Sequence, residues 1–179
     1  MQAKCQVDMT YGDISKQLFM FTIPILLSQI LQQFYNIADT AIIGRYIGTD
    51  ALAAIGSTGL LISVIVNFFI GLSTGISAVI ANQFGANEYD KLKKSISTSL
   101  AVSVLLGIVF TIGSLIFMKP IINILQTPKG VYSLAIDYLK ICFLGITFQL
   151  LYNIGTAILR ALGNTKDPLY FLIFSCILN

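Results

Sequence analysis

The chain has 179 residues, of which 56% are hydrophobic and only 11% are charged, and its net charge at pH 7 is +3. Charged residues make up about a quarter of a typical soluble domain, so this chain has too few to cover a water-exposed surface. The mean hydropathy of +0.84 indicates the lipid bilayer as the solvent, and the lack of a basic cluster interleaved with aromatic residues argues against a nucleic-acid partner.

Apolar segments follow one another along the whole chain. A helix needs roughly 20 mainly apolar residues to cross a bilayer, and four charge-poor stretches meet that length. A fifth stretch begins at Pro168, a favoured first helical position, and rises only about 18 Å, which is too short to cross. The sequence therefore predicts an all-α membrane protein: a polytopic bundle of four full transmembrane helices and a truncated fifth, in one membrane unit over 1–179. The predicted spans are about 15–40, 53–80, 95–118, 131–157 and 168–179.

Three residues inside the first two spans predict local features of the bundle. Pro24 removes one backbone donor from the first helix, so we expect a kink there. Gly71 and Gly75 form a GxxxG spacing in the second span. This spacing predicts that two helix backbones approach closely at these glycines.

The basic residues between the spans predict the orientation. Lys and Arg are more frequent in cytoplasmic connections, and a cytoplasmic N-terminus places seven of them inside against four outside. We therefore expect a multi-pass protein of the plasma membrane, the inner membrane if the cell is bacterial. The inner residues would be Lys4, Lys16, Lys91, Lys93, Lys94, Arg160 and Lys166, and the outer ones Arg45, Lys119, Lys129 and Lys140.

One carboxylate, Asp39, is the only charged side chain between Lys16 and Arg45. A carboxylate near membrane depth is costly unless it faces protein, pairs with a cation or meets water. Polar side chains also occur at Gln32, Tyr35 and Asn36, and these positions share one helix face with Asp39. This pattern favours a stripe that faces a cavity, in which Asp39 exchanges a proton or a cation. The alternative is an Asp39 that is merely solvated at the membrane interface.

Two residue counts exclude several kinds of chemistry. The chain has no histidine, which removes His-based catalytic triads, HExxH zinc sites and haem ligation by His. Cys5, Cys142 and Cys176 are odd in number and widely spaced, so they predict neither a disulfide framework nor a metal site. We expect no cofactor besides a coupling ion, Na⁺ or H⁺, with Asp39 as the ligand where that ion is Na⁺.

Three segments together resemble the first half of the MATE transporters (multidrug and toxic compound extrusion). They are GRYIGTDALAAIG (44–56), GLSTGISAVIANQFGANEYDKLKKSI (71–96) and ILRALGNTKDPLYFLIFSCILN (158–179). The resemblance implies a chain taken from a twelve-helix, two-lobe transporter, without the C-terminal lobe. It also implies export of drugs or organic cations in exchange for Na⁺ or H⁺.

The resemblance also implies roles for single residues. Asp39 matches the acidic residue of the first helix that serves cation coupling, and Tyr35 matches an aromatic residue one turn before it. Asn179 matches the asparagine of an N-x-x-x-D pattern on the fifth helix, and we assign it to cation coupling together with Asp39. Gln32, Tyr35 and Asn36 are the predicted substrate-binding residues.

Three other functions compete with the antiporter. A lipid-linked oligosaccharide or polysaccharide flippase of the same superfamily needs positive charge to hold pyrophosphate, and the predicted helix interiors contain no Lys or Arg. An intramembrane aspartyl enzyme needs two carboxylates close together. Asp39 is the one acid at useful depth, since Asp137 lies on an outer helical turn, so we expect no enzyme. A purely structural membrane protein would not account for the polar stripe.

Overall fold

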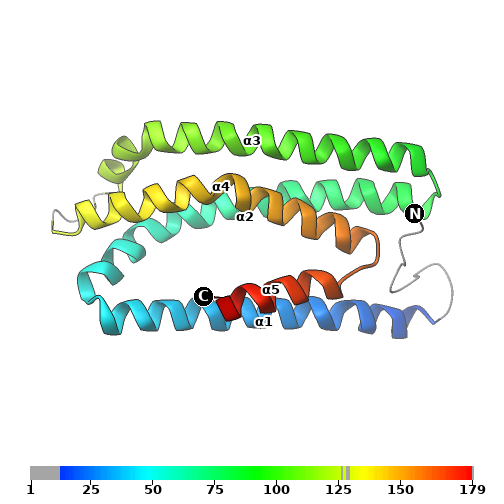
Figure 1. The fold of residues 1–179 in the computed structure, drawn as a ribbon, viewed down its shortest axis with the longest axis horizontal. Helices are drawn as coiled ribbons and strands as arrows, with labels where there is room; N and C mark the ends of the chain where they lie inside the picture. Colours follow the sequence, from blue (N-terminus) through cyan, green and yellow to red (C-terminus); the bar gives the residue numbers. More distant parts are fainter. Residues whose placement is uncertain (1–12, 126, 128–129, 179) are drawn as a thin grey trace.

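The computed structural model describes residues 13–125, 127 and 130–178, and these form a bundle of five helices (Figure 1). The helices are α1 (Ile14–Tyr46), α2 (Thr49–Gly85), α3 (Tyr89–Ile124), α4 (Tyr132–Ala161) and α5 (Lys166–Leu178). Within the described residues there is no strand, and α1 to α4 are each long and apolar enough to cross a membrane. The prediction of an all-α membrane bundle is therefore confirmed.

The helices begin and end where the sequence supplies caps and turns. The side chain of Asp13 accepts a hydrogen bond of 3.0 Å from the backbone N–H of Ser15 and caps α1. Gly48 lies between α1 and α2 with φ of 110°, a backbone conformation that favours glycine. The α1 helix continues through Pro24, whose carbonyl accepts a hydrogen bond of 2.8 Å from Ser28 Oγ.

The helices run alternately up and down, and they separate into two groups (Figure 1). The α4 helix packs mainly against α2 and α3, whereas α5 lies along α1. The buried core lies in the first group, and Phe69 of α2 and Phe110 of α3 meet edge to face with their ring centroids 5.4 Å apart. Its most deeply buried side chains are Phe69, Ile80, Ile122, Leu139, Phe143, Leu150 and Ile154.

The α3 and α4 helices approach each other closely at Gly107. A Cβ atom added to Gly107 would lie 2.9 Å from Thr147 Cα and 2.9 Å from Thr147 Cγ2. Beside it, the hydroxyls of Thr111 and Thr147 share a hydrogen bond of 3.1 Å. Small residues and hydroxyl pairs of this kind hold helices together in lipid, where burial of apolar surface gives little driving force.

The predicted close approach at Gly71 and Gly75 is wrong. Both glycines are exposed on α2, and an added Cβ would meet no atom within 4 Å at either position. They face a groove between α2 and α3 and do not contact a neighbouring backbone. The GxxxG spacing is present, but within the described residues no other helix packs against these two glycines.

Candidate functional site

A polar stripe on α4 forms one wall of the site. Gln149, Asn153, Thr156 and Arg160 follow each other at intervals of four, three and four residues, so they share one face of the helix. The opposite face carries the buried core side chains, among them Leu150. The stripe was not identified from the sequence, although its spacing is the same signal that identified the stripe on α1.

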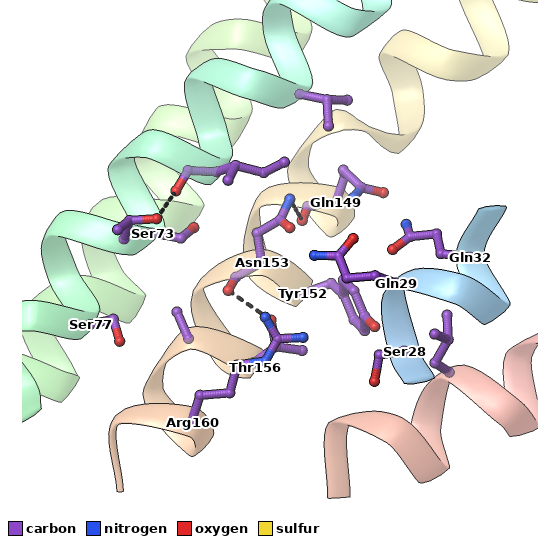
Figure 2. A pocket seen from close by; sticks show the side chains of 15 residues that line it. Ser28, Gln29, Gln32, Ser73, Ser77, Gln149, Tyr152, Asn153, Thr156 and Arg160 are labelled. Atoms are coloured by element: carbon purple, nitrogen blue, oxygen red, sulfur yellow. Dashed lines mark hydrogen bonds between the residues drawn. The ribbon is translucent and has the colours of Figure 1, made fainter. Parts of the chain in front are cut away.

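The first pocket is enclosed mainly by polar side chains of α1, α2 and α4, and its volume is about 220 Å³. Figure 2 shows side chains from these helices pointing into the same space. The labelled residues are Ser28, Gln29 and Gln32 from α1, Ser73 and Ser77 from α2, and Gln149, Tyr152, Asn153, Thr156 and Arg160 from α4. A polar cavity between apolar membrane helices can hold water or polar groups of a ligand.

The second pocket lies between α1, α4 and α5 and has a volume of about 340 Å³. Gln32, Tyr35 and Asn36, the residues predicted to bind substrate, all line it. Gln149 and Tyr152 of α4 line the opposite wall, and both also line the first pocket. The two pockets therefore share walls, and the structure brings the stripe of α1 together with the stripe of α4.

Asp39 lies one helical turn beyond Tyr35 and Asn36 on the same face of α1, and it is half-buried. It does not line either of the two pockets. Tyr35 of α1 and Tyr138 of α4 both lie close enough to Asp39 to interact with it electrostatically. The other residue assigned to cation coupling, Asn179, lies outside the described residues.

No group of three or more His, Cys, Asp or Glu side chains comes together in the part of the chain that the structure describes. Asp137 is exposed on the first turns of α4. Neither pocket is lined by an Asp or a Glu. A hard cation prefers oxygen ligands, and Tyr35 and Asn36, one turn before Asp39 on the same face of α1, carry a neutral phenol and a neutral amide oxygen.

Arg160 corrects the expectation that the helix interiors contain no Lys or Arg. The predicted fourth span ended at residue 157, but α4 continues to Ala161 and includes Arg160 in its last turn. The Arg160 side chain lines the first pocket, where it reaches toward Asn153 and Tyr152 (Figure 2). Its Nε atom is buried and has no hydrogen-bond partner.

The family model MatE matches residues 24–179 of this chain. The chain belongs to the MatE family. The resemblance to MATE transporters that the three segments indicated is thereby confirmed. Members of this family are membrane transporters, and the four apolar helices agree with a multi-pass membrane protein.

Individual MatE relatives support the same assignment. The chain is 34% identical over 164 residues to the probable multidrug resistance protein YoeA of Bacillus subtilis (strain 168), covering 92% of this chain and 35% of that protein. It is 26% identical over 167 residues to a FAD transporter of Shewanella oneidensis, and the match covers 93% of this chain and 36% of that protein.

Solved MatE structures share the fold of the described residues. A MOP superfamily transporter from Pyrococcus furiosus superposes with a TM-score of 0.91 at 26% identity, covering 99% of this chain and 39% of the other. An outward-facing MATE family transporter superposes with a TM-score of 0.89 at 26% identity and the same coverage. The chain thus spans between a third and two fifths of the length of the relatives that it matches.

Proposed function

We propose that the full-length protein is a cation-coupled antiporter that exports drugs or organic cations, with Asp39 as the coupling carboxylate. The family supports transport, and several relatives carry the names multidrug resistance or multidrug export protein. Because this chain spans only part of their length, the activity belongs to the whole protein.

The observation that carries the proposal is the position of Asp39 beside a polar cavity. Gln32, Tyr35 and Asn36 line the second pocket, and Asp39 follows on the same face one turn further along α1. An acidic side chain at the centre of a membrane helix costs about 2.5–3.5 kcal/mol on insertion scales, and one nearer the interface costs less. A carboxylate at this place is useful when it binds a cation or a proton on one side and releases it on the other.

The identity of the coupling ion is part of the proposal. A proton needs only the Asp39 carboxylate, whereas Na⁺ needs further oxygen ligands. Tyr35 and Asn36, one turn before Asp39 on α1, offer neutral oxygens, and by the family resemblance Asn179 would offer another. The pocket of about 340 Å³ is at the lower end of the range for small-molecule sites, so a drug would fill it with only part of its surface.

The test is Asp39→Asn in the full-length protein, reconstituted in vesicles with an imposed ion gradient. Asn keeps the size of the side chain and some of its hydrogen bonds, but it cannot exchange a proton or balance a cation. We expect loss of gradient-driven drug transport with normal insertion and expression. Asp137→Asn is the matched control, since Asp137 is exposed on α4 and its variant should transport normally. Wild-type transport by Asp39→Asn refutes the coupling role.

Arg160 gives the flippase alternative one supporting observation. The sequence argument against it was the lack of basic side chains inside the helices, and Arg160 lines the first pocket. Pyrophosphate carries at least two negative charges, and this pocket offers one cation. The exporter is therefore the preferred function, and a scramblase-type assay with a fluorescent lipid-linked pyrophosphate would reverse this preference if it showed movement.

We also propose that the N-terminus is cytoplasmic and that the membrane is the plasma membrane. Seven basic residues on the N-terminal side against four on the other support this orientation. Thr49 and Lys91 are both exposed. Thr49 begins α2 and Lys91 lies in the first turn of α3, and these two helix starts lie at opposite ends of the bundle (Figure 1). In intact cells, an impermeant thiol reagent should label Thr49→Cys and spare Lys91→Cys; the opposite pattern reverses the orientation.

A further inference from the structure

The first pocket contains a basic side chain that the coupling role of Asp39 does not use. Arg160 is half-buried, and its guanidinium points into the pocket between α1, α2 and α4 (Figure 2). We propose that this pocket is an anion-binding site, in which Arg160 holds a phosphate or carboxylate group of a ligand. The site is distinct from the coupling site and does not depend on its function.

Among the described residues, no Asp or Glu forms an ion pair with the Arg160 guanidinium. Its Nε is buried without a hydrogen-bond partner, and no Asp or Glu lines the pocket. Asp39 is far from Arg160. It lies near Tyr138, and at a rise of about 1.5 Å per residue Tyr138 and Arg160 are about 33 Å apart along α4. A buried N–H of a charged group that finds no acceptor is costly, and a bound anion would supply that acceptor.

Some of the other hydrogen-bond donors in the pocket already have an acceptor within the protein, and some do not. Ser28, Ser73 and Thr156 each donate their hydroxyl hydrogen to a backbone carbonyl of their own helix. The side chains of Gln29 and Tyr152 have no hydrogen bond to another described residue, and Figure 2 shows both facing the space that Arg160 enters. Arg160, Gln29 and Tyr152 thus provide a guanidinium, an amide and a phenol donor around one space, which suits an oxyanion.

The size of the pocket limits what it can hold. A volume of about 220 Å³ is below the usual range for a whole drug-sized ligand, and it is ample for one phosphate or carboxylate. Gln149 and Tyr152 also line the second pocket. The anionic group of a larger molecule can therefore occupy the first pocket while its remainder lies in the second.

The test measures binding to the purified full-length protein without an ion gradient, so its outcome is independent of Asp39. The soluble probe is phenyl phosphate, with phenol as the uncharged match, and equilibrium dialysis gives the affinity. The lipid arm is native mass spectrometry after reconstitution with phosphatidylglycerol, which counts retained anionic lipids. We expect phenyl phosphate to bind and phenol not to bind, or phosphatidylglycerol to be retained if the source of the anion is a lipid headgroup.

The variants assign the binding to Arg160. Arg160→Gln should lower the affinity for the bound anion by about tenfold or more, the effect expected when a charged hydrogen-bond donor is lost. Arg160→Lys keeps the charge without the bidentate fork and should weaken it less. Lys140→Gln is the matched control, since Lys140 is exposed on α4, and it should bind like the wild type. If Arg160→Gln does not fold, Arg160→Lys decides. Equal affinity of wild type and the Arg160 variants, or no binding of either probe, overturns the proposal.

Discussion

The two faces of α4 have opposite characters. One face carries Leu139, Phe143 and Leu150, which are fully buried against α2 and α3. The other face carries Gln149 and Arg160, which line polar pockets toward α1 and α5. One helix thus separates a packed region from a region with space for ligands. Substitutions on the buried face should lower the stability of the fold, and substitutions on the face that lines the pockets should weaken ligand binding.

The physical basis of this difference lies in how helices associate in lipid. Lipid chains are as apolar as leucine, so helices adhere through close packing and interhelical hydrogen bonds. The interface of α3 with α4 has both, at Gly107 and in the Thr111–Thr147 hydrogen bond. Between α4 and the α1–α5 pair, pockets take the place of such packing. Movement of α1 and α5 relative to α4 therefore disrupts less packing than movement of α3.

The largest expected effect is a loss of stability on the packed face of α4, caused by Gly107→Ala. The new Cβ would lie 2.9 Å from the Cα of Thr147, and a backbone atom cannot rotate away. The α3 and α4 helices must then separate locally. Overpacking of this kind costs about 1–3 kcal/mol, which we expect as a lower midpoint of thermal unfolding in detergent. An unchanged midpoint would mean that the α3–α4 interface is looser than the structure has it.

Much of the helix layout was predictable because it follows from the solvent. Charge-poor apolar stretches of this length are expected to be membrane helices, and the described helices contain most of each predicted span. The ends were harder, because helices extend past the apolar stretch into polar turns. The α4 helix continues beyond residue 157, and this extension brings Arg160 into a pocket although the sequence placed it in a connection.

Helix contacts were less predictable than helix positions. A GxxxG spacing shows that two backbones can approach, but it does not say which face of the helix meets a neighbour. Gly71 and Gly75 therefore suggested a contact that is absent, whereas the isolated Gly107 makes the close one. The polar stripe on α1 contains the carboxylate of Asp39, which is conspicuous in an apolar segment. The polar stripe on α4 contains no acidic residue, so the sequence marks it less clearly.

A smaller effect, on ligands and not on stability, is expected from Gln149→Ala. Gln149 lines both polar pockets, and its amide would hydrogen-bond a ligand in either one. Loss of one such bond is worth about 0.5–1.5 kcal/mol, so we expect the affinity of the full-length protein for a substrate of the proposed drug or organic-cation class to weaken about two- to tenfold. The unfolding midpoint should stay unchanged.

Phe148→Ala is the matched control for Gln149→Ala. Phe148 is the neighbouring residue on α4 and is 73% exposed, away from both pockets. It should leave the transport affinity as it is. If the two variants weaken transport equally, the polar face of α4 has no special role in binding, and the contrast between the two faces concerns packing alone.

The smallest expected effect is that of Gly71→Ala, which completes a pair with Gly107→Ala. Both substitutions add one methyl group to a glycine inside a long helix, so their chemistry is the same. At Gly71 the new Cβ would meet no atom within 4 Å, and alanine is the better helix former by about 0.5–1 kcal/mol. We expect an unfolding midpoint equal to that of the wild type or slightly above it, measured beside Gly107→Ala in the same detergent. A loss of stability as large as that of Gly107→Ala would show that a further part of the full-length protein packs on this face of α2, and that the GxxxG spacing has a partner after all.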